Sequence, residues 1–427
     1  MTEVNVYDKD LQMVGIIDTF ASLIWANRYW ENGDCELYLP ATMQNLNMLQ
    51  IGYFLGRNDD DMICRINYIE LDTSAENGNY LIVKGIDVKS VLDQRIVWTM
   101  QNANGNAEVF LRSLVDGALG NTDASRMLTD THGNRIFYLG AINNFTDKLT
   151  EQVTYKNLGD KCREYCRRFG WGYKVTENFG SLYFRLFKGT DRSNSVVFSN
   201  EYENLAESVY VDDETNIGNV ALIGGEGEGS ERVLRPAGTA TSFDRHELFV
   251  DAKDVSSTIT YKDLITAYPN GSATRTLETW FYTMTPLDIL VMDPAQLAWL
   301  QAAYSNGYTV TIDGNLYYEV PSADIAVLPS HYPADTDNVK IIPAIYYTLL
   351  LSRGFDKMSE YGAVKSFDGS IQPDVTFVYK QDYYLGDIVT VENEYGISVQ
   401  ARITDVVEVW DENGYSCQPV FEYIAKE

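Results

Sequence analysis

The chain has 427 residues, enough for two to four domains of ordinary size. Its hydrophobic fraction of 45% and mean hydropathy of −0.23 are those of a soluble globular protein and argue against disorder. The 33 basic and 61 acidic side chains give a net charge of −28. This charge opposes binding to nucleic-acid phosphates and docking on an anionic membrane. It favours high solubility or, as a sharper hypothesis, an acidic wall past which DNA slides.

Residues 1–100 read as short strands separated by turns. Strands at 4–7 and 13–17 flank one turn, and strands at 25–30 and 35–40 flank a second turn with Gly33-Asp34. The pair 62–71 and 80–88 flanks Asn77-Gly78, a strong hairpin signal. The 30 tyrosines of the chain also suit pleated surfaces. Short strands at this regular spacing predict a sandwich or a small barrel.

Residues 101–190 predict an α+β unit. Apolar residues recur at helical spacing over 110–119 and again over 155–169, where Gly170 is placed to end the helix. Strands follow at 172–175 and 181–187. We expect this unit to lie beside the first barrel.

Residues 191–262 return to strands, and 263–344 form an excursion. In the excursion, Asp293 and Pro294 predict the start of a helix that ends at Gly307, and Asp313-Gly314 predicts a hairpin. A helix is expected over 344–361 and strands over 370–423, the first of them at 375–379.

Within the C-terminal strands, Gly386 is expected to permit a tight bend, where Asp387 can accept bonds from local backbone N–H groups. No internal repeat of 20–50 residues is evident. The pattern predicts a mainly β fold with α+β insertions.

The sequence offers little catalytic chemistry. The three histidines, His132, His246 and His331, lie far apart, outside any HExxH, HxH or HxE pattern, and no GxSxG motif occurs. A Ser-His-Asp or Cys-His arrangement assembled in space stays open. We interpret each histidine as a surface or hydrogen-bonded core residue.

The five cysteines are scattered and odd in number, which argues against a disulfide scaffold and for folding in a reducing cytoplasm. Cys162 and Cys166 lie at i, i+4 on a predicted helix. They could share a metal, but no further ligand pair accompanies them, so we interpret them as small buried residues. No signal peptide opens the chain, and no apolar run approaches 18 residues.

Two loops could hold a ligand. The glycine-rich stretch Gly224–Gly229 resembles a phosphate loop, but it contains two glutamates and runs into another strand, so a flexible hairpin turn is the better interpretation. Asp59–Asp61 could bind a hard cation, yet three consecutive carboxylates point in different directions, so we expect a solvated turn. We therefore predict no catalytic, cofactor-binding or metal-binding residue.

Four segments, taken in order, resemble one family. They are WANRYWENGDCELYLPAT (25–42), YLIVKGIDVKSVLDQRIV (80–97), YENLAESVYVDDETNIGNVALIGGEGEGSERV with FDRHELFVDAKDV (202–255), and YYLGDIVTVENEYGISVQARITDVVEVWDENGYSCQPVF (383–421). Together they resemble the hub proteins of long-tailed siphophages of Gram-positive hosts, known as Gp37-like proteins or as the N-terminal part of a tail-associated protein. The segment around 270–340 departs from this pattern.

The resemblance implies a fold similar to a contractile-tail baseplate hub. It implies a first tube-like β-barrel in 1–100, an α+β domain in 101–190, and a second tube-like barrel whose strands lie in 191–262 and 345–427, with 263–344 inserted. Three copies would form a ring of six barrels that lets DNA pass without specific binding. In such a ring, Asp59–Asp61 and Glu226–Glu228 are candidates for the channel wall.

The resemblance also implies a setting: the virion tail tip, assembled in the host cytoplasm. The implied partners are the distal tail protein, the tail tube protein, the tape measure protein and tip or receptor-binding proteins, with no membrane contact and no cofactor. We expect no enzyme activity, because catalytic domains follow the hub region and this chain ends at Glu427 directly after its final strands.

Two alternatives remain from the sequence alone. One is a tail-associated peptidoglycan hydrolase. The other is a receptor-binding or carbohydrate-binding module that exposes the aromatic residues of the excursion, although these could equally form its core. The residues are Trp280, Tyr282, Trp299, Tyr304, Tyr317 and Tyr318.

Overall fold

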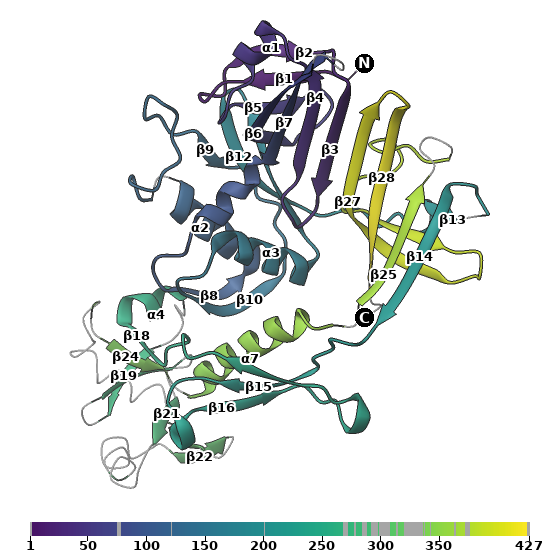
Figure 1. Ribbon diagram of the computed structural model, residues 1–427. Coiled ribbons are helices and arrows are strands. Elements are labelled where there is room, and N and C mark those ends of the chain that lie inside the picture. Colours follow the sequence, from purple (N-terminus) through teal and green to yellow (C-terminus); the bar gives the residue numbers. More distant parts are fainter. Residues whose placement is uncertain are drawn as a thin grey trace.

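One 13-stranded sheet runs through the computed structural model and joins the two ends of the chain (Figure 1). The structure describes residues 2–74, 78–120, 122–199, 201–267 and 343–424 without 363 and 372–375, and only short segments between 268 and 342. Five smaller sheets lie beside the large one within this described part. The mainly β character that the sequence predicts is confirmed, whereas the described strands of the large sheet follow an open path and not a closed barrel.

The first half of the large sheet comes from residues 4–87, which supply seven strands and a short helix, α1 (Met43–Met48). All three hairpins predicted from the sequence are present, with Val4 opposite Ile17, Trp25 opposite Cys35 and Ile69 opposite Val83. Alternate residues of β4 are buried, which is the period-2 pattern of a strand with one face on a core. The strands are β1 (Val4–Tyr7), β2 (Met13–Ile17), β3 (Ser22–Arg28), β4 (Asp34–Pro40), β5 (Phe54–Arg57), β6 (Ile63–Ser74) and β7 (Gly78–Asp87).

The second half of the large sheet comes from residues 197–213 and 364–423, which supply the other six strands. Its strand β27 pairs with β3 from Asp405 opposite Arg28 to Trp410 opposite Leu23, and this pairing joins the two halves. The strands are β13 (Val197–Ser199), β14 (Leu205–Asp213), β25 (Val364–Ile371), β26 (Ile388–Glu392), β27 (Ser398–Asp411) and β28 (Gly414–Tyr423).

The two halves repeat one topology. Four strands lie in the order β3-β4-β7-β6 in the first half and β14-β25-β28-β27 in the second, and both sets follow the same order along the chain. β5 pairs with β6 as β26 pairs with β27, and an irregularity falls after Ile66 and after Ile403 at matching places. The sequence did not reveal this repeat because residues 214–363 intervene between the first two strands of the second half.

The predicted α+β unit follows the first half. Both expected helices are present, and α3 ends where Gly170 adopts a φ of 66° and its N–H bonds the last turn. The elements are η1 (Val88–Gln94), β8 (Gln101–Asn106), α2 (Ala107–Leu119), β9 (Phe137–Leu139), β10 (Lys148–Val153), α3 (Leu158–Phe169), β11 (Gly172–Asn178) and β12 (Ser181–Phe187).

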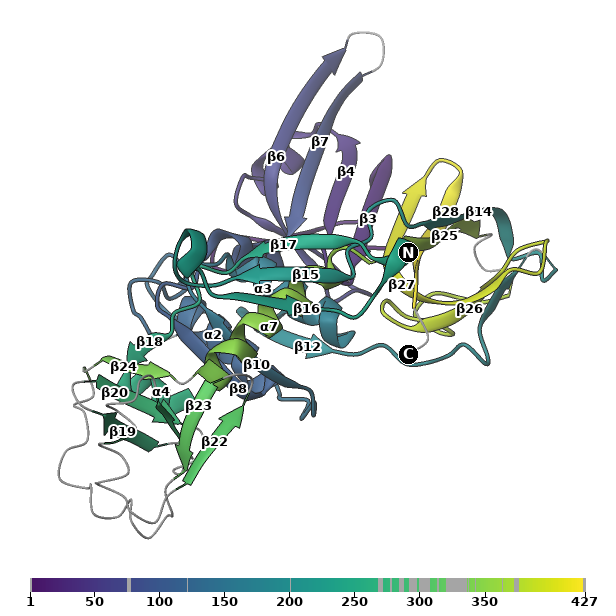
Figure 2. The same cartoon turned by 90° about the horizontal axis from the view of Figure 1, so that it is seen from below.

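Strands expected over 191–262 divide between two sheets. β13 and β14 join the large sheet, whereas β15 (Val220–Gly224), β16 (Leu234–Ala237) and β17 (Glu247–Asp251) form their own sheet, one face of which packs on helix α7 (Pro343–Ser359) (Figure 2). The remaining elements of the described residues are short: η2 (Gly229–Glu231), η3 (Ser242–Asp244), β18 (Thr258–Thr260), α4 (Tyr261–Ala267), β19 (Ser272–Thr276), β20 (Thr279–Thr283), β21 (Asp288–Val291), β22 (Tyr308–Ile312), β23 (Asn315–Glu319) and β24 (Asn338–Ile341).

One local expectation was wrong, one strand was not foreseen, and one expected helix lies outside the described residues. No strand forms over the described part of 375–379, where Tyr379 makes only an isolated bridge to Tyr383 and Lys380 turns the chain at a φ of 64°. Strand β25 was not foreseen, because its sequence VKSFDGSI has no clean alternation. The hairpin of β22 and β23 is confirmed. The helix expected from Asp293 lies outside the described residues.

Tyr29 fixes the place where the two halves meet the α+β unit. Its ring is fully buried, and its hydroxyl donates to the carbonyl oxygen of Gly170 at 3.0 Å. A Cβ atom on Gly172 or on Gly386 would lie 2.3 Å or 2.2 Å from Cε2 of this ring, so only glycine fits at either position. Gly386 also has a φ of 90°, and Asp387 accepts a bond from the Tyr384 N–H, as the sequence predicts for this bend.

We expect Gly386→Ala to lower the free energy of unfolding by about 2–4 kcal/mol, because left-handed backbone strain adds to a clash with Tyr29. Gly396→Ala is the matched control. Gly396 has a φ of 77°, but a Cβ there would meet nothing within 4 Å, so we expect a loss of only about 1 kcal/mol. Chemical denaturation of both variants measures the difference, and equal losses would contradict close packing at Tyr29.

Candidate functional site

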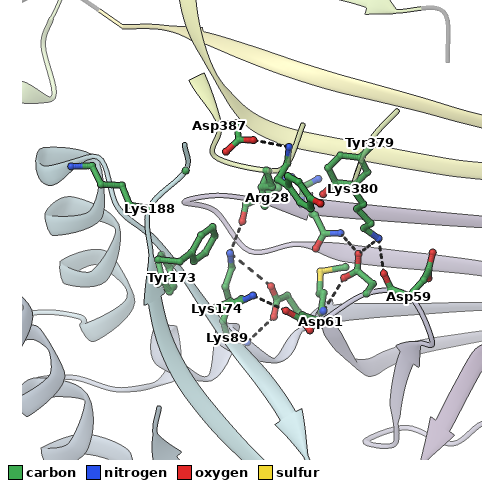
Figure 3. A pocket seen from close by; sticks show the side chains of 18 of the residues that line it. Arg28, Asp59, Asp61, Lys89, Tyr173, Lys174, Lys188, Tyr379, Lys380 and Asp387 are labelled. Atoms are coloured by element: carbon green, nitrogen blue, oxygen red, sulfur yellow. Dashed lines mark hydrogen bonds and ion pairs between the residues drawn. The ribbon is translucent and has the colours of Figure 1, made fainter. Parts of the chain in front are cut away.

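A cavity of about 650 Å³ lies where the two halves and the α+β unit meet (Figure 3). Its lining comes from the end of β3, the turn 58–62, strand β11 and the segments 187–192 and 379–387. Lys174 of β11 and Lys380 of the segment 379–387 point toward the aspartates of the turn. The cavity is therefore a junction of chain segments that are distant in sequence.

Arg57, at the end of β5, is the most constrained charge of this junction. Its fully buried guanidinium bonds Glu408 of β27 at 2.8 Å and Asp59 at 2.6 Å and 2.9 Å, and it lies 4.2 Å from the ring of Trp410. Burial opposes the charge, but the bonds to Asp59 and Glu408 outweigh it and raise the pKa of Arg57. The pair therefore ties β5 to β27 by charge-assisted bonds in addition to the sheet.

The turn Asp59–Asp61 is solvated only in part: Asp59 and Asp61 are exposed, as predicted, whereas the side chain of Asp60 is buried, which corrects the prediction there. Asp60 is almost fully buried and accepts bonds from Lys380 at 2.6 Å and from Asn27 at 2.9 Å. Asp61 accepts a bond from Lys174 of β11 at 2.6 Å, and this bond lowers the pKa of its carboxyl. Each carboxylate is paired within the chain, so the turn links three units and offers no free set of cation ligands.

Lys89 and Asp87 form a second buried pair beside the cavity. The Lys89 ammonium donates to the carbonyl oxygen of Arg28 at 2.7 Å, lies 3.8 Å from the Asp87 carboxylate and 4.8 Å from the ring of Tyr173. Burial lowers the pKa of Lys89 and raises that of Asp87, so the interior disfavours both charges. The pair resembles a structural buried ion pair, whose partners are costly to separate.

The described lining holds neither histidine nor cysteine. It presents mutually paired lysines, arginines and aspartates with apolar side chains such as Phe187 and Leu385 between them. Such a surface suits a rigid joint between domains. Sequence reasoning missed Arg57, Lys380 and Glu408, because the partners lie up to 351 residues apart and no local motif marks them.

Helix α3 extends this joint by ion pairs to every neighbouring unit. Arg163 bonds Asp93 of η1 at 2.8 Å, Arg167 lies 3.1 Å from Glu31 and 3.7 Å from Glu422 of β28, and Arg168 pairs with Asp356 of α7. These arginines therefore attach the α+β unit to both halves of the sheet and to α7.

The other residues singled out from the sequence do not converge on a site. His132 is exposed, 3.7 Å from Asp10, and His246 is exposed on a different unit, whereas His331 lies outside the described residues. Cys162 and Cys166 are buried free thiols, as predicted, and burial raises the pKa of each.

The stretch Gly224–Gly229 opens the predicted hairpin, with Gly224 opposite Leu234. Glu226 accepts bonds from the N–H and hydroxyl of Ser257, so it is engaged within the chain, while Glu228 is exposed. No helix in the described part combines the length and apolarity that crossing a membrane requires.

The family model described as "Siphovirus ReqiPepy6 Gp37-like protein" matches residues 3–421. The chain belongs to this family. The resemblance to Gp37-like proteins inferred from four sequence segments is thus confirmed over nearly the whole length. No curated protein matches this Gp37-like chain.

Solved structures give weaker likenesses. The tail protein from Neisseria meningitidis MC58 aligns over 99% of this chain and 96% of its own, with a TM-score of 0.48 and 10% identity. Prophage tail protein gp18 from Listeria monocytogenes EGD-e aligns over 100% of this chain and 95% of its own, with a TM-score of 0.47 and 10% identity. The 43 kDa tail protein of prophage MuSo2 from Shewanella oneidensis aligns over 99% of this chain and 97% of its own, with a TM-score of 0.46 and 7% identity.

We expect Glu408→Gln to lower the free energy of unfolding by about 3–5 kcal/mol, because it removes the buried counter-charge of Arg57. The control is Glu36→Gln, which breaks the exposed pair of Glu36 with Lys84 on the same sheet and should cost at most about 1 kcal/mol. Urea titrations of the two variants give the comparison. Similar small losses would show that the Arg57 pair does not hold the halves together.

Proposed function

We propose that the chain is a structural protein of a phage tail, which forms a homotrimeric ring that joins the tail tube to the distal tip and lets DNA pass. Family membership supports the siphovirus setting, and the repeated strand topology supports the ring. In this proposal the two tube-like units are 1–100 and 191–262 with 345–427, and the accessory α+β units are 101–190 and 263–344.

The observation that carries the proposal is the open end of each repeat. Within one chain, the last strand of the second repeat, β27, pairs with the first strand of the first repeat, β3. The equivalent strands at the outer ends are β6 and β14. β5 pairs with β6 at Ile63–Arg65, and the turn before β5 bonds Ile66. Among the residues that the structure describes, the edge of β6 beyond Ile66 pairs with no strand, and neither does the outer edge of β14.

Both strands with an unpaired edge carry apolar side chains that are exposed to solvent. Tyr68 and Leu71 of β6 are 44% and 49% exposed, and Val209 and Val211 of β14 are 58% and 37% exposed. A long edge strand with exposed apolar residues is a template for pairing with another chain unless something covers it. β14 of one copy beside β6 of the next would cover both and repeat the β27–β3 contact.

A ring that closes leaves no such edge free, and heterologous contacts of this kind are satisfied only by closure. Three copies would present six strand repeats to a six-fold tail tube and three chains to the tip. We propose the tail tube, distal tail and tape measure proteins as neighbours on this ring, with tip or receptor-binding proteins below. The strong negative charge of the chain would keep passing DNA from sticking.

Sedimentation equilibrium tests the ring. We expect a mass of three times the 48.3 kDa chain. Leu71→Lys and Val211→Lys place a charge at each open edge and should each give a folded monomer, because lysine on an edge strand blocks pairing.

Val420→Lys is the matched control. Val420 is 38% exposed on β28, which is paired on both sides within one chain, so this variant should remain trimeric. A wild-type monomer at tens of micromolar, or edge variants that stay trimeric, would contradict the proposed contact. Cleavage of peptidoglycan by the purified chain would favour the hydrolase alternative instead.

A further inference from the structure

A second set of buried charges lies where α7 meets the α+β unit, away from the cavity described above. Glu151 of β10, Glu164 of α3 and Asp356 of α7 place one carboxylate oxygen each within 4.8 Å of one another. Glu151 is 1% exposed and Asp356 is 5% exposed. Three elements therefore bring three carboxylates together, two of them buried and that of Glu164 partly exposed.

Cations already occupy the space between these carboxylates. The ammonium of Lys161 lies 2.6 Å from Glu151 and 2.7 Å from Glu164, so the cluster holds a lysine where a metal ion would sit. Arg168 of α3 pairs with Asp356. The arrangement is thus an ionic contact between α3, β10 and α7.

Further charged groups surround the cluster on each side. From α3, the Tyr165 hydroxyl donates to Glu151 at 2.5 Å. From α7, Arg353 lies 3.9 Å from Glu151 and 3.2 Å from Asp254, and Asp254 also pairs with Lys156. At the end of α7, Lys357 pairs with Glu360.

The hydrogen bonds of the cluster are incomplete. The second carboxylate oxygen of Asp356 is buried without a hydrogen-bond partner, and so is Nε of Arg353. A buried carboxylate oxygen without a donor costs free energy that a bound proton removes. Because Asp356 faces two other carboxylates, a proton there would also relieve their mutual repulsion.

We propose that the contact of α3 and β10 with α7 is a proton-controlled joint, in which one proton held among Glu151, Glu164 and Asp356 keeps α7 docked and its loss loosens α7. α7 packs on β15 and β16 on its other side. The joint therefore sets how firmly the β15–β17 sheet is attached to the α+β unit, independently of whether the chain forms a ring.

The pKa shifts of these carboxylates give the direction in which pH changes the docking of α7. Burial and, after it, the charge of Glu151 raise the pKa of Asp356 to about 7, against the opposing charge of Arg168. Burial also raises the pKa of Glu164. The docked state binds the proton more tightly than a released α7 would, so its stability is full at acidic pH and is lost as pH rises toward 7.

Hydrogen exchange of the α7 amides, corrected for intrinsic rates, tests the joint. In the wild-type chain, opening of α7 should rise with pH between 5 and about 7, by at most about tenfold per pH unit for one proton, and level off above. Amides of β4 and β7 serve as a reference that should show no such change. Opening of α7 that is independent of pH from 5 to 8 would overturn the proposal.

Variants of the carboxylates test which of them binds the proton. Asp356→Asn should abolish the pH dependence, and Glu164→Gln, at a partly exposed position that should tolerate the change, should move its midpoint to lower pH. Glu360→Gln, directly after the end of α7, is the control, since Glu360 pairs with Lys357 outside the cluster, and should leave the midpoint in place. An unchanged midpoint in Glu164→Gln, or a folded Asp356→Asn that keeps the dependence, would also overturn it.

Discussion

The attachment of a basic unit inside an acidic chain is the interaction on which the rest of the structure depends. Residues 101–190 carry 12 basic and 9 acidic side chains, whereas the remainder carries 21 basic and 52 acidic ones. The two halves of the large sheet would repel each other across water, and both would repel α7 and the β15–β17 sheet on which it packs. Cations of the basic unit reach acids in each of them, as Arg167 does with Glu31 and Glu422 and Lys174 does with Asp61. The α+β unit therefore holds the acidic parts in fixed positions.

Fixed positions of the two repeats matter for the proposed ring. The β27–β3 pairing sets one repeat beside the other, and the Arg57–Glu408 pair crosses the same junction. If this junction could hinge, the outer edges β6 and β14 would not reach the angle that three copies need to close. Burial of Tyr29 between two glycines, with paired charges around the neighbouring cavity, is the packing expected of a joint that does not move.

Much of the local structure could be predicted from the sequence, because its signals are local. Helix α3 followed from apolar spacing and Gly170, and hairpins followed from alternation with turns such as Asn77-Gly78. The bend at Gly386-Asp387 was also predicted, and its partner Tyr29 was not. The family resemblance rested on segments distributed over the chain and was confirmed.

The repeat and the junction could not be predicted, because their signals are not local. The two repeats share strand order without evident sequence similarity, and residues 214–363 separate β14 from β25. Asp59–Asp61 read as a solvated turn because Lys380 and Lys174, which pair with it, lie far away in sequence. Pairing partners of a buried charge are a property of the fold, so a single sequence gives no sign of them.

A reconstruction of the assembled protein by electron microscopy tests the central claim most directly. The account predicts three copies around a channel, with one continuous sheet in which β14 of each chain lies antiparallel to β6 of the next. It also predicts that the α+β unit lies outside this sheet. A reconstruction in which β6 and β14 face solvent, or in which the β27–β3 pairing is broken, would contradict the account.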